Sequence, residues 1–145
     1  LLYKATKKYN NTDSSFQKLY SLRTKYLSDD TAAYKSLLEE LSEYYKEREM
    51  YQKAETYLLE VSGFVKKRDG DTGKEYFILL TKLLSLYDAA GQTKKALAVS
   101  KDLVRVRKSI YGENHFSYAI GLAQYADRLM KEEQYGDCEG LMLTE

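Results

Sequence analysis

Four glutamates, Glu39, Glu40, Glu43 and Glu47, lie close together in the sequence and could supply acid–base chemistry. Neighbouring carboxylates can transfer protons in catalysis, but only in a pocket that shifts their pKa values. Lys46 lies among them, and mixed charge along a helix is typical of a solvated face. We therefore interpret the cluster as a solvent-exposed helix surface, with partner binding as the alternative.

Two further residues could carry chemistry, because His115 is the only histidine and Cys138 the only cysteine. A metal site or a nucleophile–base pair needs several such residues together, and the sequence has no zinc-type spacing, phosphate-binding glycine loop or nucleophile elbow. We expect His115 to pack and hydrogen-bond in a turn, and Cys138 to act as a small apolar side chain. The sequence therefore predicts no enzyme, no metal ion and no cofactor.

Composition narrows the classes of partner. The 145 residues include no proline, and 23 basic side chains nearly balance 22 acidic ones, for a net charge of +1. This balance gives no electrostatic reason to expect nucleic acid or an anionic membrane surface. No apolar run reaches the ~18–20 residues that cross a bilayer, so we expect no membrane insertion. A single cysteine fits a reducing compartment such as the cytoplasm.

The elements that position these residues repeat along the chain. Ala54, Ala96 and Cys138 lie 42 positions apart, twice over. Other matching columns are Leu38, Leu80 and Leu122; Leu41, Leu83 and Tyr125; Tyr34, Tyr76 and Tyr118; and Tyr45, Tyr87 and Leu129. A fixed period of this size predicts a solenoid, in which each unit buries its apolar face against its neighbours.

Apolar spacing within each repeat predicts paired helices. Apolar side chains in 34–45 and again in 76–87 recur on one face of a helix. The expected helices cover about 12–27, 31–48, 51–68, 73–90, 93–110, 115–132 and 135–145. Short breaks are expected near Glu49, Gly91 and Glu133, where Gly91 can take the left-handed conformation that ends a helix.

Helix starts and helix packing have sequence signals too. The expected N-cap residues are Asp30, Thr72 and Asn114, and Thr72 with Glu75 makes a capping-box pattern. The small residues at 54, 96 and 138 predict a close approach of paired helices. Their facing positions are Ser42, Leu84 and Ala126. Because Leu84 is larger, we expect the middle pair to cross at a slightly greater distance.

Fifteen tyrosines are a further feature of the chain. The column of Tyr34, Tyr76 and Tyr118 is expected to fill grooves between helices. Tyr20, Tyr44 and Tyr135 follow the repeat less closely and are candidates for an interface with a partner.

The block Leu83…Leu86-Tyr87…Gly91-Gln92…Ala96 resembles the tetratricopeptide repeat (TPR). The 42-residue period and the Gly-x-x-His turn of 112–115 resemble the kinesin light chain type. The resemblance covers nearly the whole chain and implies an all-α, superhelical solenoid of antiparallel helix pairs. It implies one array over 1–145, with a partial repeat at 1–27, repeats at 28–69 and 70–111, and a partial repeat at 112–145. Because both ends fall within a repeat, we expect the chain to be a fragment of a longer one.

The resemblance also implies a binding surface, because such proteins hold extended or helical peptides on the concave face made by the first helix of each repeat. The aligned positions are Ser36, Glu39, Glu43, Lys46 and Glu47; Ile78, Thr81, Ser85, Asp88 and Ala89; and Ile120, Ala123, Asp127, Met130 and Lys131. Carboxylates outnumber cations in this set, so we expect a basic or apolar segment of a protein or peptide as partner.

The expected function is a non-catalytic protein–protein interaction scaffold, an assembly or structural subunit of a larger complex. Two alternatives remain open, a cargo adaptor similar to kinesin light chain and a regulatory domain of a larger enzyme. The resemblance adds the cytoskeleton and the cilium as settings to the expected cytoplasmic location.

Overall fold

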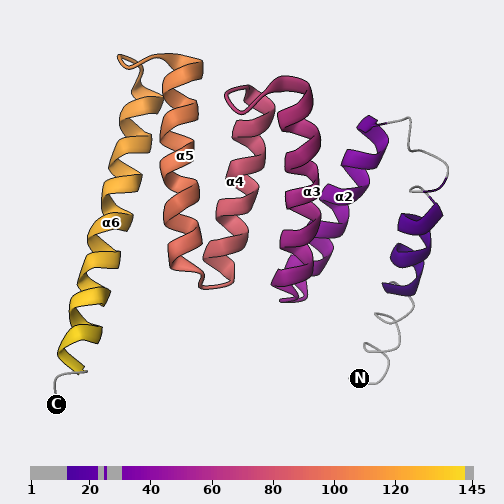
Figure 1. The fold of residues 1–145 in the computed structure, drawn as a ribbon, viewed down its shortest axis with the longest axis horizontal. Helices are drawn as coiled ribbons and strands as arrows, with labels where there is room; N and C mark the ends of the chain where they lie inside the picture. The colour runs from indigo at the N-terminus through magenta and orange to yellow at the C-terminus, as the bar shows by residue number, and fades with distance from the viewer. Residues whose placement is uncertain (1–12, 23–24, 26–30, 143–145) are drawn as a thin grey trace. The chain divides into compact units, whose positions relative to one another are not determined.

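The computed structural model describes the backbone of residues 13–22, 25 and 31–142, and the side chains of residues 13–22, 25 and 32–133. Every regular element in this part of the chain is an α-helix. The helices are residues 13–22, α2 (Thr31–Glu47), α3 (Tyr51–Asp69), α4 (Lys74–Ala89), α5 (Thr93–Tyr111) and α6 (Phe116–Met142) (Figure 1). The predicted all-α class is confirmed, and α2 to α6 each begin within one residue of the predicted start. The superhelical solenoid stays a prediction.

The chain divides into two compact units, Leu1–Phe64 and Val65–Glu145. In the first unit, α2 packs on α3 through a small polar contact. Ser42 Oγ donates a hydrogen bond to Ala54 O at 3.0 Å, and both residues are buried. A larger side chain at either position would push the backbones apart. The close approach predicted for this pair is therefore confirmed.

An aromatic cluster joins residues 13–22 to α2 and α3 in the first unit. Neighbouring ring centroids lie 4.6 to 6.3 Å apart. The cluster consists of Phe16, Tyr20, Tyr34, Tyr44, Tyr45, Tyr57 and Phe64. Tyr20 and Tyr44, which the sequence left open for an interface, thus pack within their own unit. The side chain of Tyr135 lies outside the described residues.

The hydroxyl of Tyr45 holds residues 13–22 against α2. It donates to Asp13 Oδ1 and accepts from Gln17 Nε2, both at 2.7 Å. The Tyr45 side chain is fully buried, and its ring stacks on Tyr57 at 5.7 Å. Burial, together with the hydrogen bond to Asp13, raises the pKa of Tyr45 to about 12.

In the second unit, α4 packs on α5, and α5 packs on α6. The buried face of α4 consists of Tyr76, Leu79, Leu80, Leu83, Leu86 and Tyr87, the set that apolar spacing predicts. Ala96 of α5 is 1% exposed, so the second member of the small column is also buried. The greater distance expected at Leu84 stays a prediction.

Two turns are equivalent and lie 42 residues apart. After α2, Glu49 N–H donates to Lys46 O and Met50 N–H donates to Tyr45 O. After α4, Gly91 N–H donates to Asp88 O and Gln92 N–H donates to Tyr87 O. Both are Schellman turns with a left-handed residue, at φ of 60° for Glu49 and 67° for Gly91. The predicted breaks at these two positions are confirmed.

The third predicted break, near Glu133, is wrong, because α6 continues from Phe116 to Met142. Residues 131–134 are Lys-Glu-Glu-Gln, all strong helix formers, and no glycine stands among them. A turn there would force a glutamate into the left-handed region, as happens at Glu49, against a local preference to remain helical. The side chain of Cys138 lies outside the described residues.

Two of the predicted N-caps are also wrong. The residue before α4 is Gly73, with no side-chain cap, and Glu75 lies 3.9 Å from Arg68 rather than completing a capping box with Thr72. At α6 the cap is His115 instead of Asn114, because His115 Nδ1 accepts the backbone N–H of Ser117 at 3.1 Å. Asp30 lies outside the described residues.

The predicted role of His115 as a packing and hydrogen-bonding turn residue is confirmed. Its ring stacks on Tyr111 with centroids 4.8 Å apart. We expect His115→Ala to lower the free energy of unfolding by about 1 kcal/mol, the usual cost of losing an N-cap. Asn114→Ala, one residue earlier, is the matched control and should change it by less than about 0.5 kcal/mol. Equal effects of the two substitutions in urea titrations would contradict this assignment.

Candidate functional site

The surface that carries the most varied chemistry lies in the second unit, where α4 and α6 run in the same direction on either side of α5 (Figure 1). Arg107 of α5 ties the three helices together. Its guanidinium lies 5.5 Å from the centre of the Phe77 ring on α4. Nη1 of Arg107 also lies 3.3 Å from both Ser117 O and Gln124 Oε1 on α6. Phe77 and the first turns of α6 are therefore at the same end of the surface.

Gly121 allows this arrangement because it has no side chain. A Cβ added there would lie 3.0 Å from Arg107 Cδ and 3.2 Å from its Nη1. In the other repeats this position is Leu37 and Leu79, which are both buried. The glycine thus opens space that an apolar core residue fills elsewhere, and the stem of Arg107 occupies part of it.

Ion pairs stand at the opposite end of the surface. Arg128 of α6 donates two hydrogen bonds of 2.7 Å to the carboxylate of Asp88 on α4. This bidentate pair raises the pKa of Arg128, with the hydrogen bond to Asp88 as the main cause. Lys131 Nζ binds Asp127 Oδ2 at 2.8 Å, one helical turn apart on α6. Asp88 and Asp127 therefore each have a cation as partner.

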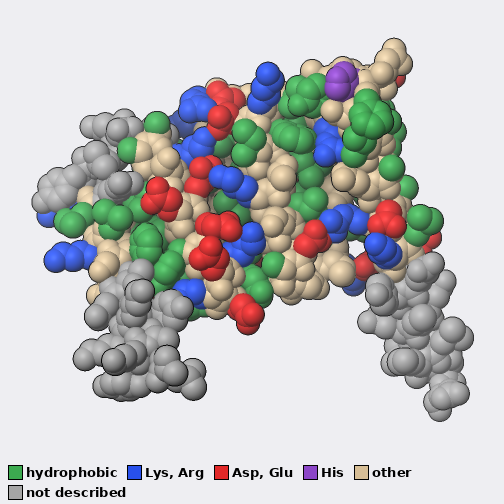
Figure 2. All heavy atoms as spheres, turned by 180° about the vertical axis from the view of Figure 1, so that it is seen from behind, with side chains coloured by type: hydrophobic (Ala, Val, Ile, Leu, Met, Phe, Trp, Pro, Cys, Tyr) green, Lys and Arg blue, Asp and Glu red, His purple; other side chains and the backbone are tan. Residues whose placement is uncertain are grey.

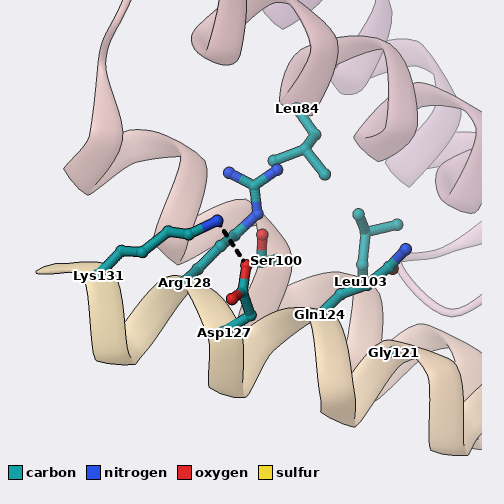
Figure 3. Close-up of a pocket in the computed structure, with 8 residues that line it drawn as sticks. All are labelled: Leu84, Ser100, Leu103, Gly121, Gln124, Asp127, Arg128 and Lys131. Carbon is teal, nitrogen blue, oxygen red and sulfur yellow. Dashed lines mark hydrogen bonds and ion pairs between the residues drawn. The ribbon is translucent and has the colours of Figure 1, made fainter.

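A pocket of about 250 Å³ opens between the two ends. It is lined by Leu84, Ser100, Leu103, Gly121, Gln124, Asp127, Arg128 and Lys131 (Figure 3). The Arg128 guanidinium extends toward Leu84, and the Lys131 ammonium points toward Asp127 (Figure 3). Ser100 Oγ donates to Ala96 O at 2.9 Å, an ordinary contact within a helix. We call the pocket and the flanking faces of α4 and α6 the α4–α6 groove.

Apolar side chains are exposed at the Arg107 end of the α4–α6 groove. Phe116 is 77% exposed, Ile78 49% and Ile120 37%. Figure 2 shows hydrophobic side chains gathered beside the histidine on this face of the second unit. Exposed clusters of large apolar side chains are commonly sites of interaction with another molecule.

The predicted partner-binding residues divide between the two units. Asp127 and Lys131 line the pocket, Asp88 pairs with Arg128, and Ile78 and Ile120 belong to the apolar end. Further exposed predicted residues on α4 and α6 are Thr81, Ser85, Ala89, Ala123 and Met130.

The α2 members of the predicted set lie in the first unit, with Ser36, Glu43 and Glu47 exposed and Glu39 and Lys46 half-buried. Glu43 Oε1 lies 3.4 Å from Lys46 Nζ, as expected for a solvated helix face.

The sequence reasoning missed Arg107, Gln124, Arg128 and Phe116. A signal for the groove was present in the repeat itself. Arg128 falls in the column of Tyr44 and Leu86, and Gly121 falls in the column of Leu37 and Leu79. A glycine and an arginine in two otherwise apolar columns indicate that this part of α6 does not pack as the aligned helices do. Such a break in the repeat is a signal of a binding surface.

The described residues contain no group of three or more His, Cys, Asp or Glu side chains placed to hold a metal ion. None of the described helices has the length and apolarity needed to cross a membrane. No protein-family model matches the sequence, and no curated protein matches it as a relative.

The Asp88–Arg128 pair offers a test of how firmly α6 is held to α4. Both side chains are partly exposed, at 46% and 29%, so solvent screens the attraction. We expect Arg128→Gln to lower the free energy of unfolding by less than about 1 kcal/mol. The loss should shrink at high salt. In a double-mutant cycle with Asp88→Asn, the interaction energy between the two side chains should account for most of the loss. Equal losses at low and high salt would show that packing, not charge, explains the effect.

Proposed function

We propose that this chain is a non-catalytic protein-interaction scaffold built from tetratricopeptide-like helix pairs, and that the α4–α6 groove holds a segment of a partner protein. The observation that carries the proposal is the groove itself. It combines a pocket with exposed apolar side chains, and Phe116 is 77% exposed. Surfaces that bind proteins typically combine apolar anchoring positions with a polar rim.

The polar groups of the groove suit binding better than catalysis. Asp88 and Asp127 each form an ion pair with a cation, so neither is a desolvated carboxylate of the kind that general acid–base catalysis uses. Ser100 bonds to the backbone of its own helix, with no base among its described partners. Donors such as Gln124 and Lys131 can instead hydrogen-bond to the backbone of a bound segment.

Two observations support the tetratricopeptide-like architecture. The Schellman turns after α2 and α4 use the same hydrogen bonds at positions 42 residues apart. The small residues Ala54 and Ala96 are both buried, at 0% and 1% exposure. A third feature supports a place inside a larger assembly, because Leu122 and Met130 of α6 are 42% and 56% exposed.

The proposal is tested by selecting peptides from a random phage-displayed library against the chain and measuring the binding of the selected peptides by calorimetry. Ile120→Asp places a charge at the apolar end of the groove and should weaken binding by about tenfold or more. Leu59→Asp is the matched control, because Leu59 is 51% exposed on α3 in the other unit. Failure to select any peptide, or equal loss in both variants, would contradict the proposed site.

A further inference from the structure

We infer that the segment held by the α4–α6 groove is extended and uncharged, with a bulky apolar side chain at the Arg107 end. This inference rests on the proposed function and specifies the chemistry of the partner. Counting acidic and basic residues in the aligned positions predicts a basic or apolar segment, and that count omits Arg128. The structure places Arg128 in the groove, where it changes the balance of acidic and basic charge.

Charge pairing inside the groove carries the first step. Asp88 is bound by Arg128 and Asp127 by Lys131, so these two carboxylates and two cations cancel at the ion-pair end of the groove. At the other end, the Arg107 guanidinium is covered by the uncharged Phe77 ring and contacts Ser117 O and Gln124 Oε1. A basic segment would have to compete with Arg128 for Asp88, and an acidic segment would have to compete with Asp88 for Arg128. Either exchange gives up a bidentate hydrogen-bonded pair, so at the ion-pair end of the groove a charged segment gains little over a neutral one.

The second step is the apolar end. Phe116 and Ile120 are one turn apart on α6, and Ile78 of α4 follows Phe77, whose ring contacts Arg107. Arg107 also donates a hydrogen bond to Ser117 O on α6. Ile78 on α4 and Phe116 and Ile120 on α6 therefore lie at the same end of the groove. Leucine- or phenylalanine-sized side chains gain the most from covering such a surface.

The third step is length. Ile120 and Lys131 are separated by eleven helical positions, or about 16 Å at 1.5 Å per residue. An extended chain covers about 3.3 Å per residue, so about five residues span the groove from the apolar end to the ion pairs. Along this path the Gln124 amide and the Lys131 ammonium can donate hydrogen bonds to backbone carbonyls, which every peptide provides.

The test uses the composition of the peptides selected above and their response to salt. We expect selected peptides to carry a large apolar residue and near-zero net charge. Introducing one lysine or one aspartate into the bound segment should weaken binding by about fivefold or more. Raising the salt from low to high concentration should change the affinity of the neutral peptide by less than about twofold, because the peptide itself carries no charge for the salt to screen.

Substitutions in the chain locate the bound segment. Ile120→Asp should weaken the neutral peptide by about tenfold or more, the loss expected for one apolar anchor. Phe116→Ser is a second variant at the same end, and its high exposure makes it harmless to folding. Leu59→Asp should leave the affinity unchanged.

The possible results separate this inference from the proposed function. Selection of charged peptides, with strongly salt-dependent binding that Ile120→Asp still weakens, would overturn the inference and leave the proposed function standing. Neutral peptides whose binding survives both Ile120→Asp and Phe116→Ser would overturn the assigned position. The absence of any selected peptide would overturn the proposed function and with it the inference.

Discussion

Tyr45→Ala is expected to lower the free energy of unfolding of the first unit by about 3–5 kcal/mol, the usual loss when a buried aromatic ring becomes alanine. The Tyr45 ring is fully buried, and its centroid lies 5.2 Å from that of the Tyr44 ring and 5.7 Å from that of the Tyr57 ring. The substitution would also remove the partner of Asp13 and Gln17, which would release residues 13–22 from α2. Urea titration monitored by the near-ultraviolet circular dichroism of the tyrosines measures this loss.

Tyr45→Phe separates the hydroxyl from the ring. It keeps the stacking and removes both hydrogen bonds, so we expect a smaller loss of about 1–2 kcal/mol. If Tyr45→Phe were as damaging as Tyr45→Ala, the hydroxyl and not the ring would be the main source of stability. If neither variant changed the unfolding midpoint, the aromatic cluster would not hold the first unit together.

The raised pKa of Tyr45 adds a pH dependence to this prediction. Its pKa is about 12 in the folded chain against an ordinary value of 10.0, so the folded state favours the neutral phenol. The stabilisation is complete below pH 10 and is lost as the pH rises toward 12. Tyr45→Phe should flatten that part of the stability profile, and an unchanged alkaline slope in the variant would show that other groups cause it.

Regular apolar spacing predicted the helices well, because burial of one face decides both their existence and their register. Apolar spacing within 76–87 predicted one apolar face for α4, and this face is buried, from Tyr76 to Tyr87. Periodicity of this kind reflects the summed burial of many side chains, so a single irregular residue does not hide it.

Helix ends were predicted less well, because they depend on small differences between competing local contacts. Glu49 adopts a left-handed conformation after α2, whereas the aligned Glu133 remains inside α6. Thr72 could cap α4 by its residue type, but the helix begins one position later, after Gly73. Sequence alone does not show which of two adjacent residues takes the cap when both arrangements differ by about 1 kcal/mol or less.

The candidate site was predicted only in part, because its distinctive residues interrupt the repeat. Ile78, Ile120 and Asp127 follow from the resemblance to tetratricopeptide repeats, whose concave positions they align with, and they belong to the α4–α6 groove. Arg128 and Gly121 do not follow, because their columns are apolar elsewhere and averaging over the repeats hides them. The balance of charge in the groove depends on Arg128, and the prediction made without it favoured a basic or apolar partner segment.

Ala96→Leu is expected to lower the free energy of unfolding of the second unit by about 1–3 kcal/mol, because added methylenes in a closely packed helix contact force strain. Ala96 is 1% exposed, and its carbonyl accepts the Ser100 hydroxyl at 2.9 Å. In the first unit the equivalent residue, Ala54, contacts Ser42 so closely that Ser42 Oγ reaches the Ala54 carbonyl at 3.0 Å. The small side chains at 54 and 96 are therefore both buried, and in the first unit the contact between the paired helices is close.

Ala98→Leu is the matched control, because Ala98 lies in the same helix but is exposed. Alanine and leucine have similar helix propensities, so this change should stay within about 0.5 kcal/mol of the parent chain. The two variants then differ only in whether the added side chain is buried, and urea titrations compare their free energies of unfolding. Equal stability of Ala96→Leu and Ala98→Leu would mean that the contact at Ala96 relaxes without strain. In that case a small side chain at 54, 96 and 138 would not be required for helix packing, and the 42-residue column would lose its physical explanation.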